Sequence, residues 1–294
     1  MAGSVTSLFV FGLGNSAGAF ARSSLAGGAK VAGTVRSEDK AARLRAEGIA
    51  ALVFDGASSS GEVAAALRDA THLVLSIPPG ETGDPALRFH AADILAAKNL
   101  GWIGYLSTIG VYGDYGGAWV SERTTPHPRP GRSAERLDAE KAWRALAEKR
   151  GVPLSILRLA GIYGPGSNAL KNLAEGKARR IVKDGQVFNR VHVDDIVATL
   201  DAAMNKAADG IFNVCDDEPA PPQDVVEYAA TLMGAPVPPP LDFDGADLTP
   251  MAQSFYGENK RVLNRRIREE LGIALAYPTY REGIAALWRS GRWR

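Results

Sequence analysis

The feature that most constrains the fold of this 294-residue chain is a short apolar run that leads directly into a glycine turn. Residues 8–11 (Leu-Phe-Val-Phe) are too few to cross a membrane and have the length of a buried strand. Gly12 and Gly14 follow at once, and residues 15–25 are alanine-rich, as in a helix. A buried strand, a tight turn and a helix in immediate succession are typical of the first βα unit of a parallel α/β sheet.

The small residues of this turn have separate physical roles in a phosphate-binding site. Gly12 permits the tight turn, Gly14 lets the backbone approach a pyrophosphate, and Ala17 lets the helix pack close to the strand. The start of the helix presents unpaired N–H groups and its positive dipole end. A purely structural glycine turn is the alternative, which the strand–helix context disfavours. We therefore predict a dinucleotide cofactor in contact with Gly12, Gly14, Asn15, Ser16 and Ala17.

Strands and helices alternate through the first half of the chain. Strands are expected at residues 31–35, 51–54, 73–75, 102–106 and 154–159, and helices at 38–47, 61–67, 84–98 and 132–150. This spacing predicts an α/β fold with a Rossmann-type, doubly wound parallel sheet, whose ligands lie at the carboxyl ends of the strands. By that rule we expect Ile77 and Pro78, after the fourth strand, and Ser107, directly after the fifth, to contact the cofactor.

The regular alternation of strands and helices ends in the second half of the chain. Helices are expected at residues 168–175, 194–205, 224–233, 260–271 and 282–289, and extended segments at 187–193 and 211–214. We expect a dinucleotide-binding domain over residues 1–158, to which the chain returns at about 190–215, and a smaller, discontinuous substrate-side lobe over 159–294. The Gly- and Pro-rich residues 113–131 predict a long loop, of a kind that often serves as a functional lid.

Composition excludes several classes of protein. The 46% hydrophobic and 23% charged content is ordinary for a globular protein, and a formal net charge of +1 gives no reason to expect nucleic acid or an anionic membrane as partner. Cys215 is the single cysteine, so neither an intrachain disulfide nor a thiolate metal cluster can form. No two histidines have the spacing of a metal site, and no signal peptide is evident. We expect a cytoplasmic protein that takes a small-molecule substrate and binds no metal; a homodimer remains open.

The second strand ends where the cofactor's ribose would lie. A site that prefers NAD usually has an acidic residue there, whereas this chain has Arg36 and Ser37, with no acid before Glu38. A guanidinium matches a 2′-phosphate in bidentate fashion, so we predict that NADP(H) is preferred over NAD(H). A solvated surface arginine is the alternative. Asp55 and Gly56 are expected along the adenine edge, although Asp-Gly is also a common turn.

Four further motifs follow in order: Ser-Thr-Ile-Gly-Val-Tyr-Gly at 107–113, Glu-Arg-Thr-Thr-Pro-His-Pro at 122–128, Arg-Leu-Ala-Gly-Ile-Tyr-Gly-Pro at 158–165, and Val-His-Val-Asp-Asp-Ile at 191–196. Together with the glycine turn, the chain resembles the short-chain dehydrogenase/reductase superfamily, in particular its extended and atypical NAD(P)-dependent epimerase/dehydratase-like members. The resemblance implies that Thr108 binds the substrate oxygen beside a catalytic tyrosine. It also implies that Ala160, Gly161 and Ile162 pass the nicotinamide amide.

The chain departs from this family at the catalytic pair. The family has Tyr-x-x-x-Lys followed by an acid four residues later; with Glu140 as that acid, Arg136 stands for the lysine and Arg132 for the tyrosine. Positions i and i+4 share a helix face, so both arginines could face the cofactor, with Arg136 on ribose or phosphate. An arginine cannot act as the acid. An ordinary solvated helix face is the alternative. Tyr112 and Tyr163 are candidates for a relocated proton donor, or are packed aromatics.

The resemblance implies that Asn168 and Arg190 contact the substrate, and we add Tyr163. With Thr108, Tyr112, Arg132 and Arg136 as the catalytic candidates, the preferred function is an atypical NAD(P)-dependent oxidoreductase or epimerase. Its substrate would be a small carbonyl or hydroxyl compound, of which sugar derivatives are one class. The alternative is a catalytically silent NADP(H)-binding sensor or scaffold, because the tyrosine is lost.

Overall fold

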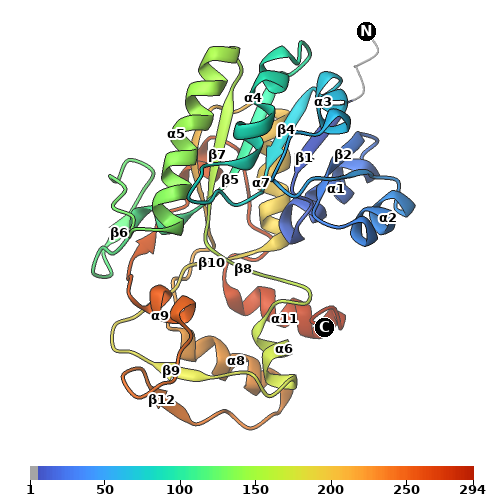
Figure 1. Cartoon of the computed structure of the whole chain (residues 1–294). Helices are drawn as coiled ribbons and strands as arrows, with labels where there is room; N and C mark the ends of the chain where they lie inside the picture. Colours follow the sequence, from blue (N-terminus) through green and yellow to red (C-terminus); the bar gives the residue numbers. More distant parts are fainter. Residues whose placement is uncertain (1–5) are drawn as a thin grey trace. The chain divides into compact units, whose positions relative to one another are not determined.

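The computed structural model describes residues 6–294, and the chain forms two compact units, both drawn in Figure 1. The first comprises the chain up to Val111 together with Arg129–Arg158 and Val197–Phe212. The second comprises Tyr112–Pro128, Leu159–Ile196 and Asn213–Arg294.

A seven-stranded sheet flanked by helices is the basis of the first unit (Figure 1). Its strand order is β11–β7–β5–β4–β1–β2–β3, and the pairings from β3 through β5 are parallel. The strands are β1 (Ser7–Phe11), β2 (Lys30–Val35), β3 (Ala50–Val53), β4 (His72–Leu75), β5 (Trp102–Thr108), β7 (Leu154–Leu159) and β11 (Gly210–Val214). This order has β1 between β2 and β4, as in a doubly wound sheet, so the predicted Rossmann-type fold is confirmed.

Strand β1 is the buried centre of this sheet. Residues 8–11 are all fully or almost fully buried, which requires cover on both faces and explains why the run does not alternate with polar residues. On one face, Phe9 and Phe11 join a hydrophobic cluster with residues of α3 (Gly61–Arg68), α4 (Pro85–Ala96) and α5 (Arg132–Arg150).

Helices of the first unit begin and end close to their predicted limits. Besides α3, α4 and α5, they are α1 (Asn15–Ala26), α2 (Glu38–Ala46) and α7 (Val193–Asn205), the last of which continues from the second unit. Asp84 caps α4 by accepting from Ala86 N at 2.9 Å, and its second oxygen accepts from Trp143 Nε1 at 2.9 Å. One buried carboxylate therefore both starts α4 and ties it to α5.

The core of the second unit lies among α6 (Ala169–Ala174), α8 (Pro222–Met233) and α11 (Tyr280–Ser290). Short parallel pairs join β8 to β10, β9 to β12 and β6 to β13. The strands are β6 (Trp119–Val120), β8 (Gly161–Tyr163), β9 (Arg180–Val182), β10 (Arg190–His192), β12 (Pro240–Asp242) and β13 (Arg261–Val262). Two further helices are α9 (Pro250–Tyr256) and α10 (Arg265–Glu269).

One expectation for this unit is wrong. The single helix expected at residues 260–271 is β13 followed by the short α10, because the Asn264 side chain donates to Cys215 O at 2.8 Å and Val262 N donates to Asn189 Oδ1 at 2.8 Å. Residues 113–131 form the expected long loop apart from the two-residue strand β6, and their role as a lid stays a prediction. Asn259 N donates to the Asp114 carboxylate and β6 pairs with β13.

Candidate functional site

The glycine turn closes the carboxyl end of β1. Gly12 has a left-handed φ of +87°, and a β-carbon there would lie 3.0 Å from Ile77 Cγ1. The Gly12 N–H donates to Thr34 Oγ1 at 2.9 Å, and Gly14 N donates to Gly12 O at 2.7 Å. The turn is thus held by a hydrogen bond to Thr34 of β2 and lies against Ile77, which follows β4. Gly12 and Ile77, two of the residues predicted to contact the cofactor, therefore lie next to each other.

Gly14 forms an open cradle at the start of α1. It is the N-cap residue, with an ordinary φ of −78° and no side-chain cap on the helix. A β-carbon on Gly14 would meet nothing closer than Gly12 O at 4.0 Å, so the protein itself does not fill this space. Ala17 is fully buried, Asn15 is exposed, and the first turn contains no acidic residue. Uncapped N–H groups beside empty space at a neutral helix start fit the pyrophosphate of a dinucleotide.

An exposed cation follows the carboxyl end of β2. Arg36 is exposed and makes no hydrogen bond or ion pair with any residue that the structure describes. Ser37 is the N-cap of α2 and its side chain caps nothing. Asp55 accepts from Ala57 N at 2.8 Å and Gly56 has φ +81°, so this pair forms a turn, as in the alternative interpretation. Pro78 is exposed.

Thr108 is half-buried at the end of β5, and its hydroxyl accepts from Gly110 N at 3.1 Å. A β-carbon on Gly110 would lie 3.3 Å from Thr108 Oγ1 and 2.9 Å from Ser133 Oγ. Two hydroxyl groups, from β5 and from α5, therefore approach the same point. Ser133 was not among the predicted site residues; its place next to Arg132 on α5 was the available signal.

The two arginines predicted at the Tyr and Lys positions of the family are placed differently. Arg136 Nη1 donates to Leu106 O at 2.7 Å, and the guanidinium carbon lies 5.7 Å from the centre of the Tyr105 ring. Arg132, the first residue of α5, is exposed and has no hydrogen bond or ion pair with the described part of the chain. Arg136 thus supports the backbone of β5, whereas Arg132 retains all its donors for a ligand.

A buried ion pair lies beside them. Arg158 donates from Nε and Nη2 to Glu140 at 3.1 and 2.7 Å, and Ser107 Oγ donates to the same carboxylate at 2.5 Å. The Ser107 hydroxyl is therefore committed, so a contact of Ser107 with a cofactor would have to come from its backbone. The signal for the pair was an arginine within the predominantly apolar strand β7, because a buried charge needs a partner.

Neither candidate phenol is placed as a proton donor. Tyr112 is fully buried and its hydroxyl donates to Asn213 Oδ1 at 2.8 Å. Tyr163 packs so tightly on α11 that a β-carbon at Gly283 would overlap its hydroxyl, and burial raises the pKa of Tyr163 above its ordinary value. Both behave as packed aromatics with tied or buried hydroxyls, which argues against Tyr112 as a catalytic residue.

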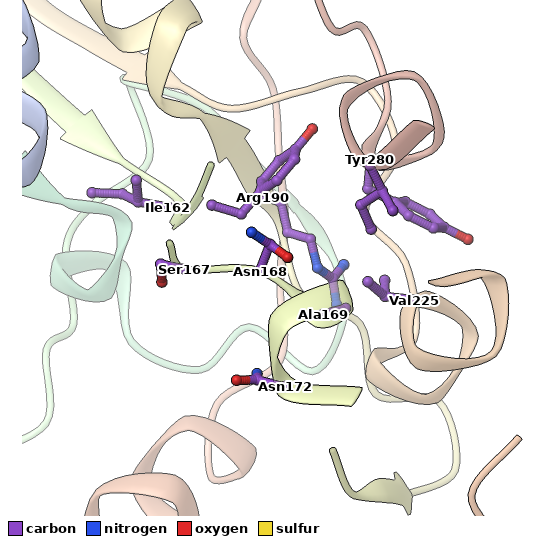
Figure 2. Close-up of a pocket in the computed structure, with 10 residues that line it drawn as sticks. Ile162, Ser167, Asn168, Ala169, Asn172, Arg190, Val225 and Tyr280 are labelled. Atoms are coloured by element: carbon purple, nitrogen blue, oxygen red, sulfur yellow. The ribbon is translucent and has the colours of Figure 1, made fainter. Parts of the chain in front are cut away.

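The three predicted substrate residues line one pocket of the second unit. Figure 2 shows this pocket, whose volume is about 230 Å³, with Asn168 and Arg190 among the sticks; Tyr163 lines it as well. Asn168 caps α6 by accepting from Lys171 N at 3.0 Å, and its amide donates to Gly164 O and Trp293 O at 2.8 Å each. Asn168 therefore shapes the pocket. Exposed Asn172, one turn further along α6, also lines it and was not predicted.

Ala160, Gly161 and Ile162 belong to the second unit, and their contact with a nicotinamide remains a prediction. Over residues 6–294, no group of three histidine, cysteine or acidic side chains could hold a metal ion. No helix in the same range is long and apolar enough to cross a membrane.

Comparisons with known proteins agree with this geometry. Residues 86–215 match the model of the NAD dependent epimerase/dehydratase family. The chain is 31% identical over 222 residues to Protein YeeZ of Escherichia coli K12, covering 72% of this chain and 74% of that protein. It is 32% identical over 159 residues to the 3-diazoavenalumate denitrifying reductase of a Streptomyces species, covering 48% and 51% of the two chains.

A solved structure of a functionally unknown conserved protein from Silicibacter pomeroyi DSS is 46% identical and has a TM-score of 0.88, covering 98% of this chain and 99% of that one. The family match begins after the glycine turn, so the assignment of the turn rests on its geometry. Sequence, fold and turn geometry agree: the chain belongs to the NAD dependent epimerase/dehydratase family of the short-chain dehydrogenase/reductase superfamily.

Proposed function

We propose that this protein is an NADP(H)-dependent oxidoreductase that acts on a small carbonyl or hydroxyl compound in a cytoplasmic setting. The observation that carries the proposal is the open cradle at Gly14, with uncapped N–H groups at the start of α1 and the uncommitted Arg36 after β2. The reductase among its relatives supports the reaction class.

The preference for NADP(H) rests on Arg36. Because Arg36 has no partner among the described residues, a 2′-phosphate would gain its charge without breaking an existing ion pair. The side chain is exposed, so we expect the lower end of the range for a charge-assisted hydrogen bond, about 1.5 kcal/mol or roughly tenfold in affinity.

Calorimetric titration with NADPH and NADH tests this preference. Arg36→Ala should remove most of it, whereas Arg68→Ala, an exposed arginine on α3, should leave both affinities unchanged. Equal affinities of the parent protein for the two cofactors would refute the preference.

For catalysis we propose that Thr108 hydrogen-bonds the substrate oxygen and that Arg132 stabilises the negative charge that develops on it. When bound, NADPH supplies the hydride. Turnover is measured as NADPH oxidation across a panel of aldehydes, ketones and sugar lactones. Thr108→Ala should lower kcat by about 10²-fold, as for loss of an oxyanion-type donor, and Thr108→Ser should retain most of the rate. A rate that survives Thr108→Ala would remove Thr108 from the mechanism.

A silent NADP(H)-binding sensor is the second candidate function. The observation in its favour is that arginine replaces the catalytic tyrosine while both candidate phenols are packed. The same panel distinguishes the two candidates. Tight NADPH binding without turnover of any compound would favour the sensor.

A further inference from the structure

Arg190 in strand β10 has only part of its guanidinium in use. Its Nη1 donates to Phe188 O at 2.9 Å and to Ala220 O at 3.1 Å. Within residues 6–294, no hydrogen bond or salt bridge engages its Nε or Nη2. The two backbone contacts fix the plane of the group, so the Nε–Nη2 edge has a defined direction without a protein partner.

Other arginines of this chain show what such an edge binds. Arg22 donates from Nε and Nη2 to Glu47 at 2.6 and 3.2 Å, and Arg266 donates from the same two atoms to Glu270 at 2.5 and 2.7 Å. Arg158 holds Glu140 in the same way. The edge matches the spacing of two oxygens in a carboxylate or a phosphate. In Arg190 the corresponding oxyanion is not supplied by the described chain.

Arg190 forms no salt bridge with an acidic side chain of residues 6–294, and its guanidinium carbon lies 5.8 Å from the centre of the Tyr280 ring. The carboxyl group of Asp216 interacts electrostatically with Arg190, and the Asp216 N–H donates to Arg190 O at 2.7 Å. Burial raises the pKa of Asp216 to about 8, and the charge of Arg190 acts in the opposite direction. The same burial lowers the pKa of Arg190. Buried charges in proteins are normally paired, and a guanidinium with an unused Nε–Nη2 edge in the lining of a pocket is a feature that a ligand would complete.

The pocket around Arg190 limits the size and character of that ligand. Figure 2 shows the Arg190 side chain running between Asn168 and Val225. Ile162, Val225 and Ile284 make part of the lining apolar, and Asn172 adds an amide from α6. At about 230 Å³ the pocket is smaller than the roughly 300–1,000 Å³ of most drug-sized ligand sites. It has room for one anionic group and a short apolar body.

We propose that this pocket binds the anionic end, a carboxylate or a phosphate monoester, of a small substrate through the Nε–Nη2 edge of Arg190. The identification of the ligand as substrate rests on the proposed function; the anion site itself does not. The site would select singly anionic, compact substrates, because the pocket contains a single cation and little volume.

The test is to titrate the full-length protein, without cofactor, with inorganic phosphate and, in a separate experiment, with isobutyrate. Binding is measured as NMR line broadening of the phosphate or isobutyrate signal. Gly14→Val is titrated in parallel, because its cofactor phosphate site is blocked while the pocket is unchanged. Asn172→Asp places a negative charge in the pocket at an exposed position where the fold tolerates it. Asn99→Asp, exposed in the first unit, adds the same charge elsewhere.

We expect saturable binding of at least one probe to the parent and to Gly14→Val. Asn172→Asp and Arg190→Lys should weaken it about tenfold, and Asn99→Asp should not change it. Tighter binding of phosphate identifies a phosphate monoester as the class, and tighter binding of isobutyrate a carboxylate. No saturable binding, or binding that Asn172→Asp and Arg190→Lys leave unchanged, overturns the proposal. NADPH titrations of the same variants report on the proposed function independently.

Discussion

Gly12 and Gly14 stand two residues apart in one turn, and the structure predicts opposite consequences when each acquires a side chain. A β-carbon on Gly14 meets no protein atom closer than 4.0 Å, and the φ of −78° suits any L-residue. At Gly12 the φ is +87° and a β-carbon would lie 3.0 Å from Ile77 Cγ1 and 3.1 Å from Ile77 N. Gly14→Val should therefore abolish cofactor binding in a folded protein, whereas Gly12→Ala should destabilise the fold.

The magnitudes follow from these contacts. Valine is a poorer N-cap than glycine, so Gly14→Val should lower the free energy of unfolding by about 1 kcal/mol at most. The added side chain occupies the space next to the uncapped N–H groups of α1 and displaces the pyrophosphate. Loss of two charge-assisted hydrogen bonds, each about 1.5–3 kcal/mol, predicts an affinity loss of more than about 100-fold. Gly12→Ala costs about 1–2 kcal/mol for the left-handed backbone alone, and the contacts with Ile77 add to it.

The assay combines calorimetric NADPH titration with urea unfolding followed by circular dichroism for the parent and both variants. Gly61→Ala is a matched control, because a β-carbon there has no neighbour within 4 Å and the residue lies in α3. If folded Gly14→Val binds NADPH as tightly as the parent, the cofactor does not lie on this turn and the reasoning fails. A Gly12→Ala variant as stable as the parent would show that the turn relaxes without cost.

Two further predictions concern buried carboxyl groups. Glu140→Ala leaves a buried guanidinium unpaired and should cost about 3–5 kcal/mol in urea unfolding, whereas Glu148→Ala, exposed on the same helix, should cost less than about 0.5 kcal/mol; equal costs would contradict the ion pair. Asp216 has its folded pKa raised to about 8, far above the unfolded value of about 3.9, so the folded state keeps a proton that the unfolded state loses. The free energy of unfolding should therefore fall as pH rises from about 4 to about 8, and Asp216→Asn should flatten this dependence; an unchanged slope would mean that Asp216 is ionised in the folded protein.

The part of the fold that the sequence predicts well is the part whose signals are local. Residues 8–11 form an unbroken apolar run because β1 is covered on both faces, and α3 and α4 begin at residues whose side chains cap them, Ser60 and Asp84. The prediction of a helix at residues 260–271 was wrong because the contacts that decide their structure are distant in the sequence. The charged and apolar pattern of these residues favours a helix, but Asn189, more than seventy residues away, and β6 hold β13 extended.

The residues of the candidate site also differ in whether the local sequence predicts them. Gly12, Gly14 and Ala17 were predictable because the turn must accept a left-handed residue, an open cradle and a close packing contact at fixed spacing. The commitment of Tyr112 to Asn213, 101 residues later, leaves no trace in the local sequence. Arg190 was predicted from the family resemblance, but its unoccupied edge depends on carbonyl groups of Phe188 and Ala220 that only the fold brings together.

The predicted replacement of the catalytic tyrosine by Arg132 would limit how this site could reduce a carbonyl, because the alkoxide oxygen needs a proton. Arginine stays protonated at neutral pH and can stabilise charge without giving up a proton. Thr108 and Ser133 are the hydroxyls that approach one point at the end of β5, and a hydroxyl can relay a proton from solvent without itself ionising. Such a relay would leave kcat nearly independent of pH between about 6 and 9, since neither hydroxyl titrates there, whereas a tyrosine held next to a cation would titrate. The pH dependence of turnover therefore distinguishes a hydroxyl relay from a displaced phenol, even before the substrate is known.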